Sequence, residues 1–261
     1  MKKILTIAGS DSSGGAGIQA DLKTIAAHKM YGMSVITALT AQNTMGVNGI
    51  FDVDAGFVGE QIDAVFQDIF PDAVKIGMVN NEEVIKKIGL SLEKYKPENI
   101  VVDTVMVSTS GHSLISESAY EALVENLIKK ADIITPNIPE AEVLSGMKIL
   151  TKKDMYDAAV KINELVNDTA VLIKGGHMVE CSDDLLLVNG KEKWFAQEHI
   201  DNENIHGTVC TLSSAIACEL ASGKDIEESV RDAKSYITGA IKWNLDIGNG
   251  KGPLNHMHEY M

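Results

Sequence analysis

A segment near the C-terminal end of the chain has the residue types that phosphate chemistry requires. In residues 206–217 a glycine, Gly207, is followed by a run of small and apolar residues, so the segment is predicted to be a turn that opens a helix. The start of a helix attracts anions, because its first backbone N–H groups are unpaired and carry the positive end of the helix dipole. Cys210 falls in the first turn, where a thiol loses its proton more readily. The segment predicts phosphate transfer to a small molecule; a buried cysteine at an ordinary helix start is the alternative.

A second glycine-rich segment, residues 9–17, comes directly after the first apolar run. Gly9 and Gly14 are five residues apart, as in phosphate-binding loops, but Gly15 and Ala16 stand where such a loop needs Lys and Ser or Thr. Without a basic residue the segment is poorly suited to a triphosphate. It suits the close approach of backbone to a neutral or planar ligand, with Asp11 as an acceptor. A flexible turn followed by a helix cap explains the segment equally well.

Three further residues follow apolar runs and can contact ligands. Gln42 offers one acceptor and two donors, which can read the edge of a heterocycle. Met78 can pack on an aromatic ring, although a plain core methionine is the simpler interpretation. Lys174 ends an apolar run and precedes two glycines, which favours contact with a nucleotide phosphate.

Acidic residues suggest a cation site. Asp103 ends an apolar run, and an ionised carboxylate at a buried strand end needs a partner, for which a metal ion is one candidate. Asn137 and Glu140 are three residues apart at the expected start of a helix. This spacing is that of a capping box, and the same pair can also face a hydrated magnesium ion.

Short apolar runs alternate with amphipathic segments along the chain. The expected strands are 3–8, 34–39, 74–77, 99–103, 133–134, 170–174, 185–188 and 193–196. The expected helices are one that begins near 18 and those at 57–70, 117–130, 153–167, 208–222 and 226–244. Such alternation predicts an α/β fold, with a mostly parallel sheet between helical layers, in one domain over 1–261. Ligands bind beyond the carboxyl ends of such strands, so the following loops, including 40–44, are expected to form the site.

Charge and cysteine content narrow the function classes. The 261 residues include 23 basic and 37 acidic side chains, a formal net charge of −14. This balance argues against nucleic acid and anionic membranes as partners, and no apolar stretch is long enough to span a bilayer. The three cysteines are odd in number and lack metal-ligand spacing, which favours the reducing cytoplasm.

Six segments in this order resemble the bacterial hydroxymethylpyrimidine/phosphomethylpyrimidine kinases of thiamin biosynthesis, which belong to the ribokinase-like superfamily. The segments are 9–21, 41–44, 103–111, 135–142, 174–177 and 204–212. The resemblance implies a three-layer α/β/α domain that is usually a homodimer. It also implies the use of ATP and Mg²⁺, with phosphorylation first of an alcohol and then of its monophosphate.

The resemblance also assigns roles to single residues. The pyrimidine pocket would be lined by Gly9, Asp11, Ala16, Gln42 and Met78. Magnesium would be organised by Asp103 and Glu140. The nucleotide phosphates would be contacted by Asn137, Lys174 and Thr208. The anion hole would be formed by the amides of Gly207, Thr208, Val209 and Cys210. Cys210 would be the candidate base, either as a thiolate or as a neutral thiol.

Four positions depart from the family pattern near the chemistry. Val209 stands where the family has glycine, and it would be strained at positive φ or would crowd the γ-phosphate. Ile205, Thr104 and Thr109 replace a usual Thr, Pro and Lys. A vitamin-binding homologue that has lost catalysis through Val209 is therefore one alternative. A pyridoxal kinase is another, because the same scaffold and cysteine serve that activity in related proteins. Gln42 favours the aminopyrimidine, because a pyridoxal ring has no matching edge.

Overall fold

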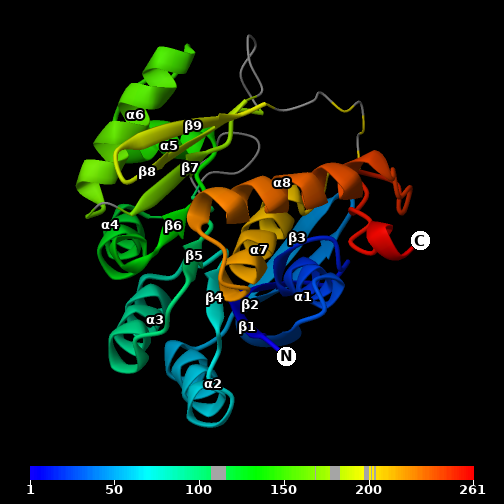
Figure 1. The fold of residues 1–261 in the computed structure, drawn as a ribbon. Coiled ribbons are helices and arrows are strands. Elements are labelled where there is room, and N and C mark those ends of the chain that lie inside the picture. Colours follow the sequence, from blue (N-terminus) through cyan, green and yellow to red (C-terminus); the bar gives the residue numbers. More distant parts are fainter. Residues whose placement is uncertain (107–115, 168, 177–182, 197–199, 201, 203) are drawn as a thin grey trace.

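The structure is a computed structural model that describes residues 1–106, 116–167, 169–176, 183–196, 200, 202 and 204–261. Within them a nine-stranded sheet lies between two layers of helices (Figure 1). The strands are β1 (Lys3–Asp11), β2 (Tyr31–Asn43), β3 (Gly46–Asp52), β4 (Ala73–Ile76), β5 (Ile100–Val102), β6 (Ile133–Ile134), β7 (Ala170–Ile173), β8 (Asp184–Val188) and β9 (Lys191–Phe195). The α-helices are α1 (Gly17–Ala27), α2 (Ala55–Asp68), α3 (Glu82–Tyr95), α4 (Glu117–Asn126), α5 (Ile138–Ser145), α6 (Lys152–Leu165), α7 (Thr208–Ala221) and α8 (Ile226–Lys242).

The sheet is mostly parallel, as predicted. Its order is β3-β2-β1-β4-β5-β6-β7-β8-β9, and all pairs from β2 to β7 are parallel. Both edges of the sheet are antiparallel. At one edge β3 pairs with β2, and at the other edge β8 pairs with β7 and forms a hairpin with β9. The turn of that hairpin has positive φ at Asn189 and Gly190, the backbone that an Asn-Gly pair favours.

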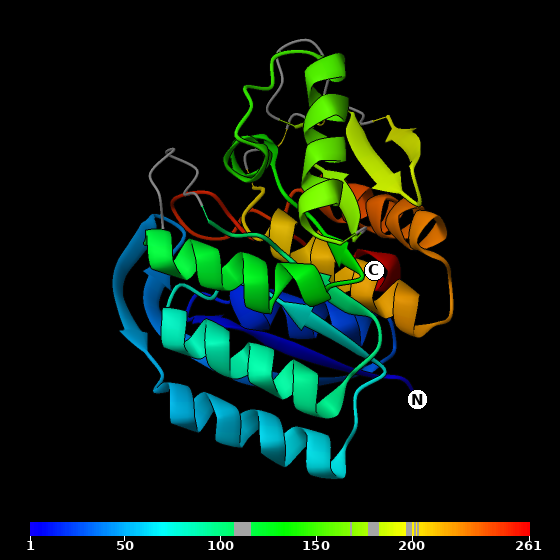
Figure 2. The same cartoon turned by 90° about the vertical axis from the view of Figure 1, so that its left-hand side faces the viewer.

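Each face of the sheet has its own hydrophobic core. Successive residues of a strand point to opposite faces, so Leu5 and Ile7 of β1 join one core and Ile4 joins the other. Helices α2 to α6 cover the first face, and Figure 2 shows α2, α3 and α4 packed in a row over it. Helices α1, α7 and α8 cover the second face. These layers hold the carboxyl ends of the parallel strands at one edge.

The structure differs from the sequence prediction in several places. Residues 40–43 belong to β2 and pair with β3, so the prediction of a loop at 40–44 was wrong for most of its length. The cause is β3, whose residues are all exposed and therefore lack the apolar pattern of a buried strand. The helix expected at 117–130 ends at Asn126, and a 3₁₀ turn follows at Ile128–Lys130. The sequence analysis did not predict α3. Among the described residues, no helix has both the length and the apolarity to cross a membrane.

Candidate active site

The residues expected to form the pyrimidine pocket come from different elements and meet at the carboxyl edge of the sheet. A Cβ atom on Gly9 of β1 would lie 3.2 Å from the Cε of Met78, which follows β4. Gln42 of β2 reaches His206, which stands just before α7, with 3.3 Å between the two Nε2 atoms. His206 also lies 3.1 Å from the carboxylate of Asp11, so it joins two of the expected residues that precede it by 164 and 195 positions.

The two glycine-rich segments of the chain interlock. Gly207 has φ +86°, a conformation that favours glycine, and a Cβ there would lie 1.9 Å from the carbonyl oxygen of Gly15. On the other side, a Cβ on Gly15 would lie 2.4 Å from the ring of His206. Gly207 is required by its positive φ and by the close backbone of Gly15, whereas a side chain at Gly15 would displace the ring of His206. The predicted glycine turn that opens a helix at Gly207 is confirmed.

The first turn of α7 differs from the prediction in its backbone conformation. Val209 lies inside the helix and is not among the residues with positive φ, so the expectation of strain at Val209 was wrong. The amide of Thr208 donates to the carbonyl oxygen of Ile205 at 3.2 Å, as does its hydroxyl at 2.6 Å. One of the four amides expected in the anion hole is therefore already used. The first amides of a helix have no intrahelical acceptors, which leaves those of Gly207, Val209 and Cys210 as anion donors.

Cys210 carries a thiol that holds its proton more tightly than a free cysteine. The residue keeps some solvent exposure, but its sulfur lies among enough protein atoms that burial raises the pKa to about 11. The ammonium of Lys75 and a hydrogen bond from the amide of Gly17 lower the pKa of the thiol, whereas Asp21 and Asp103 raise it. The prediction of an activated thiol was wrong, because the cost of burial exceeds the effect of the helix start. Cys210 is a neutral thiol near pH 7.

A buried ion pair lies close to Cys210 and was not found by the sequence analysis. Lys75 of β4 and Asp21 of α1 are both fully buried, and the ammonium lies 2.9 Å from each carboxylate oxygen. The hydroxyls of Thr6 and Ser214 also donate to this carboxylate, at 2.6 and 2.8 Å. The charge on Asp21 raises the pKa of Lys75 despite its burial. The sequence signal that could have revealed the pair is the position of Lys75 inside an apolar run, where it points to the strand face opposite to Val74 and Ile76.

The acidic residues predicted to organise magnesium lie close to a lysine. Asp103 is 1% exposed, and its Oδ1 accepts a hydrogen bond from Thr135 at 3.3 Å and lies 3.5 Å from the ammonium of Lys174. Among the described residues, neither the Oδ2 of Asp103 nor the Nζ of Lys174 has a hydrogen-bond partner. Buried polar atoms without partners are rare in folded proteins, so these two atoms are available to a ligand.

Glu140 is the second of these acids and also caps α5. The side chain of Asn137 accepts from the amide of Glu140, and Glu140 accepts from the amide of Asn137, both at 2.9 Å, so the predicted capping box is confirmed. Thr104 donates to the same carboxylate at 3.2 Å. Burial raises the pKa of Glu140 to about 7; the Lys174 ammonium partly offsets this rise and the Asp103 carboxylate adds to it.

The donor set fits a hydrated magnesium ion. Two buried carboxylates, one with an unpaired oxygen and the other with a raised pKa, lack sufficient positive charge around them. Mg²⁺ is usually held by one or two carboxylates, with water and substrate phosphates as its other ligands. Within the described part of the chain, no group of three or more His, Cys, Asp or Glu side chains could enclose a metal ion. Asp103 and Glu140 thus suit a cation that arrives with a nucleotide.

The glycine-rich segment after β1 is organised by its own carboxylate. Asp11 is 2% exposed and accepts hydrogen bonds from the amides of Ser13, Gly15 and Ala16, and from the hydroxyl of Ser13. His206 lies 3.1 Å from the same carboxylate. Although burial opposes it, these hydrogen bonds hold the pKa of Asp11 well below its usual range. The amides that a phosphate-binding loop would turn toward its ligand are occupied by Asp11.

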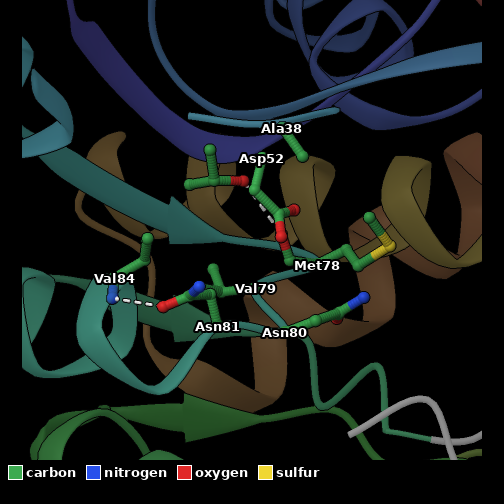
Figure 3. A pocket seen from close by; sticks show the side chains of 8 residues that line it. Ala38, Asp52, Met78, Val79, Asn80, Asn81 and Val84 are labelled. Atoms are coloured by element: carbon green, nitrogen blue, oxygen red, sulfur yellow. Dashed lines mark hydrogen bonds between the residues drawn. The ribbon is translucent and has the colours of Figure 1, made fainter. Parts of the chain in front are cut away.

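A small hollow lies beside Met78 (Figure 3). Its volume of about 10 Å³ is the space of a single water molecule. Its lining residues are Thr37, Ala38, Asp52, Met78, Val79, Asn80, Asn81 and Val84. Met78 is the only residue among them that the sequence analysis assigns to substrate binding, and the hollow is too small for a pyrimidine ring.

The remaining departures from the family pattern lie in different places. Ile205 is 43% exposed, and Thr104 contributes its hydrogen bond to Glu140. Thr109 lies outside the described residues, so the expected loss of a lysine there has no structural account.

Comparison with known proteins groups the chain with vitamin kinases. The family model described as phosphomethylpyrimidine kinase matches residues 11–255. The thiamine biosynthesis bifunctional protein ThiED of Geobacter sulfurreducens is 48% identical over 255 residues, which are 97% of this chain and 52% of that protein. The chain thus spans about half the length of this relative. The hydroxymethylpyrimidine/phosphomethylpyrimidine kinase of Escherichia coli is 41% identical over 266 aligned residues, covering 100% of both chains.

Solved structures of similar fold point to the same group of enzymes. The phosphomethylpyrimidine kinase of Clostridium difficile aligns with a TM-score of 0.85 and 50% identity, over 93% of this chain and 100% of that chain. An ADP complex of Bacillus subtilis pyridoxal kinase aligns with a TM-score of 0.92 and 36% identity, over 100% of this chain and 99% of that chain.

Proposed function

The chain belongs to the phosphomethylpyrimidine kinase family, and we propose that it transfers a phosphoryl group from ATP first to the hydroxymethyl group of an aminopyrimidine and then to the resulting monophosphate. The observation that carries this proposal is the proximity of three groups. The first amides of α7 and the Cys210 thiol belong to the same helical turn, and the Asp103 carboxylate, which follows β5, is close enough for its charge to raise the pKa of that thiol. The amides would contact the transferred phosphoryl group, the thiol would contact the acceptor, and the carboxylate would contact the cation.

Phosphoryl transfer depends on positioning and charge neutralisation more than on a strong base. The amides of Gly207, Val209 and Cys210 would donate hydrogen bonds to the transferred group. Asp103 and Glu140 would hold magnesium, which supplies positive charge to the phosphates when it is bound. The ammonium of Lys174, which has no hydrogen-bond partner among the described residues, would contact the nucleotide phosphates together with Asn137 and Thr208.

The acceptor would lie between the glycine-rich segment and Met78. Gly9 and Ala16 allow close approach of the ring, Met78 packs on its face, and Gln42 pairs with its edge. Cys210 would contact the hydroxymethyl group as a neutral thiol, because its pKa of about 11 leaves little thiolate at neutral pH. A neutral thiol also does not repel the incoming phosphate.

Pyridoxal phosphorylation is the second candidate function. It is favoured by the likeness to Bacillus subtilis pyridoxal kinase over the whole chain. Gln42 argues for the aminopyrimidine, since its acceptor and donor match the amino group and ring nitrogen of that ring. Parallel assays of both substrates separate the two candidates.

A homodimer is part of the proposal. Large apolar side chains on the β2–β3 edge are strongly exposed: Leu39, Val47, Ile50 and Phe51 are 46%, 51%, 57% and 70% exposed. Such a patch is typical of an interface between subunits. Light scattering should give twice the chain mass for the native protein and a lower mass for Phe51→Asp. A native monomer would contradict the dimer without affecting the proposed reaction.

The decisive experiment identifies the products by mass spectrometry. Incubation with 4-amino-5-hydroxymethyl-2-methylpyrimidine, ATP and magnesium should yield the monophosphate and then the diphosphate. Cys210→Ala should lose most product formation and keep pyrimidine binding, measured by calorimetry. Near-normal activity in Cys210→Ala would remove the thiol from the mechanism. Pyrimidine binding without any product in the native protein would indicate a binding protein with weakened catalysis.

A further inference from the structure

Gln42 lies between two side chains that limit how its amide can be oriented. The end placed as Nε2 is 3.3 Å from the Nε2 of His206, and the end placed as Oε1 is 3.1 Å from the Oγ1 of Thr40. The oxygen and nitrogen ends of a glutamine amide have nearly the same shape, so turning the amide by half a turn preserves both contacts. The hydrogens on the two neighbours therefore decide which end faces which neighbour.

His206 faces an atom that can only accept a hydrogen bond. Its Nε2 lies 3.1 Å from the Oδ2 of Asp11, and this carboxylate is ionised because its many hydrogen bonds hold its pKa low. The Nε2 of His206 must therefore carry a hydrogen and donate to Asp11. A donor at this position repels the N–H groups of Gln42 and attracts its oxygen. The oxygen of Gln42 must therefore face His206, and the Nε2 hydrogen of His206 is shared between this oxygen and the carboxylate of Asp11.

Thr40 leads to the same orientation from the other side. Its hydroxyl lies 2.9 Å from the carbonyl oxygen of Ser10, which can only accept. A hydroxyl has one hydrogen, and Thr40 uses it on Ser10. The oxygen of Thr40 then has only acceptor capacity left for Gln42, so it requires an N–H group there. His206 and Thr40 therefore independently require the same orientation of the Gln42 amide.

We infer that His206 and Thr40 are positioning residues that hold the Gln42 amide with its oxygen toward His206 and its nitrogen toward Thr40. The hydrogen bonds then run in one direction, with His206 donating to Asp11 and Gln42, Gln42 to Thr40, and Thr40 to Ser10. One lone pair and one N–H of Gln42 stay free, in a fixed order.

The order of these two free groups determines specificity. An aminopyrimidine presents a donor, its amino group, next to an acceptor, its ring nitrogen. The hydroxymethyl group must point to the phosphoryl group, so the ring has one allowed direction along the edge of Gln42. If the Gln42 amide were reversed, its N–H would face the amino group of the ring and its oxygen would face the ring nitrogen, and neither pair could form a hydrogen bond. The specificity argument rests on the proposed function, whereas the orientation of the amide follows from the structure alone.

Neutron diffraction from deuterated crystals of the native protein tests the orientation directly. We expect deuterium on the Nε2 of His206 and two deuterium atoms on the end of Gln42 that faces Thr40. Deuterium on the end that faces His206 would overturn the inference. This readout needs neither activity nor a variant.

Calorimetry tests the consequence for specificity. The probes are 4-amino-5-hydroxymethyl-2-methylpyrimidine and 5-hydroxymethyl-2-methylpyrimidine, which lacks the amino group. We expect Thr40→Val and His206→Leu each to reduce the affinity ratio of the two probes about tenfold, because a wrong polar contact costs this much. Thr40→Ser and His206→Gln keep the hydroxyl and an N–H donor, and should restore most of the ratio.

His28→Leu is the matched control, since His28 is also an imidazole near a carboxylate, 3.6 Å from Glu219, but at the opposite end of α1. It should leave the ratio unchanged. An unchanged ratio in both Thr40→Val and His206→Leu would overturn the specificity argument. If the native protein binds neither probe, the proposed function fails, and the neutron result still tests the orientation.

Discussion

Two buried charge clusters lie at the carboxyl ends of the neighbouring strands β4 and β5, and they differ in how completely their charges are paired. In the Lys75–Asp21 cluster, which also contains Thr6 and Ser214, the ammonium contacts both carboxylate oxygens and each oxygen accepts a hydroxyl. The Asp103–Glu140 cluster, which also contains Thr104 and Lys174, keeps a carboxylate oxygen and an ammonium without hydrogen-bond partners within the described residues.

From this difference we expect the first cluster to have a structural role and the second to bind a ligand. Removal of one partner from a fully paired buried cluster destabilises the fold, because the other charge stays buried without compensation. A cluster with unpaired buried atoms is less favourable in the free protein, and a ligand of suitable charge relieves it. The first cluster should therefore control stability and the second should control activity.

The largest expected effect is on stability, from Lys75→Met. The variant leaves the Asp21 carboxylate buried without its cation, which should lower the free energy of unfolding by about 3–5 kcal/mol. Urea denaturation measures the loss. The double variant Asp21→Asn/Lys75→Met should recover part of it, because it removes both charges. A loss below about 1 kcal/mol in Lys75→Met would mean that the pair is not a structural element.

Asp103→Asn should have the opposite profile. Loss of the carboxylate that we propose as a cation ligand should reduce kcat about 10²–10³-fold, the usual cost of one electrostatic group in an active site. The free energy of unfolding should change by less than about 1 kcal/mol, because an incompletely paired charge is removed. Steady-state kinetics and urea denaturation on the same sample give both values. A large loss of stability with normal kcat would reverse the comparison between the clusters.

The buried side chain of His256 should make the stability of the protein depend on pH. It is 3% exposed and lies 3.0 Å from the hydroxyl of Thr211, one residue after Cys210. Burial, together with the charges of Lys23 and His258, lowers its pKa to about 4 from 6.5. In the unfolded chain His256 takes up a proton as the pH falls below about 6.5, whereas in the folded chain it does so only near pH 4.

The contribution of His256 to stability is therefore complete above pH 6.5 and is lost as the pH falls through 4. The loss should reach about 3 kcal/mol. His256→Gln, which can keep a hydrogen bond to Thr211, should flatten the stability profile between pH 6.5 and 4 in thermal unfolding. An unchanged slope in this variant would show that His256 does not titrate in this range.

Val209→Gly should have the smallest effect. Glycine inside a helix should cost about 1 kcal/mol of stability, because Val209 has ordinary helical geometry and no strain is relieved. Turnover should rise if the methyl groups of Val209 crowd the phosphate. A coupled assay of ADP release measures turnover, and an unchanged rate would mean that the anion hole accommodates valine.

The sequence predicted the elements whose periodicity reflects burial, and it did not predict the elements without such a signal. The parallel strands and the capping box at Asn137 and Glu140 were predicted because apolar runs and cap spacing are local. The exposed strand β3 was missed, and residues 40–43 were therefore assigned to a loop. The pKa of Cys210 was predicted in the wrong direction, because its surroundings come from α1 and β4.

The sequence by itself determined the alternation of strands and helices and the family motifs, since each depends on residues close together in the chain. Only the tertiary structure decided which charges are paired. Lys75 meets Asp21 across 54 positions, and His206 meets Asp11 across 195. Pairing over such separations depends on how helices pack on the sheet, and a buried charge or hydrogen-bond donor takes its properties from those partners.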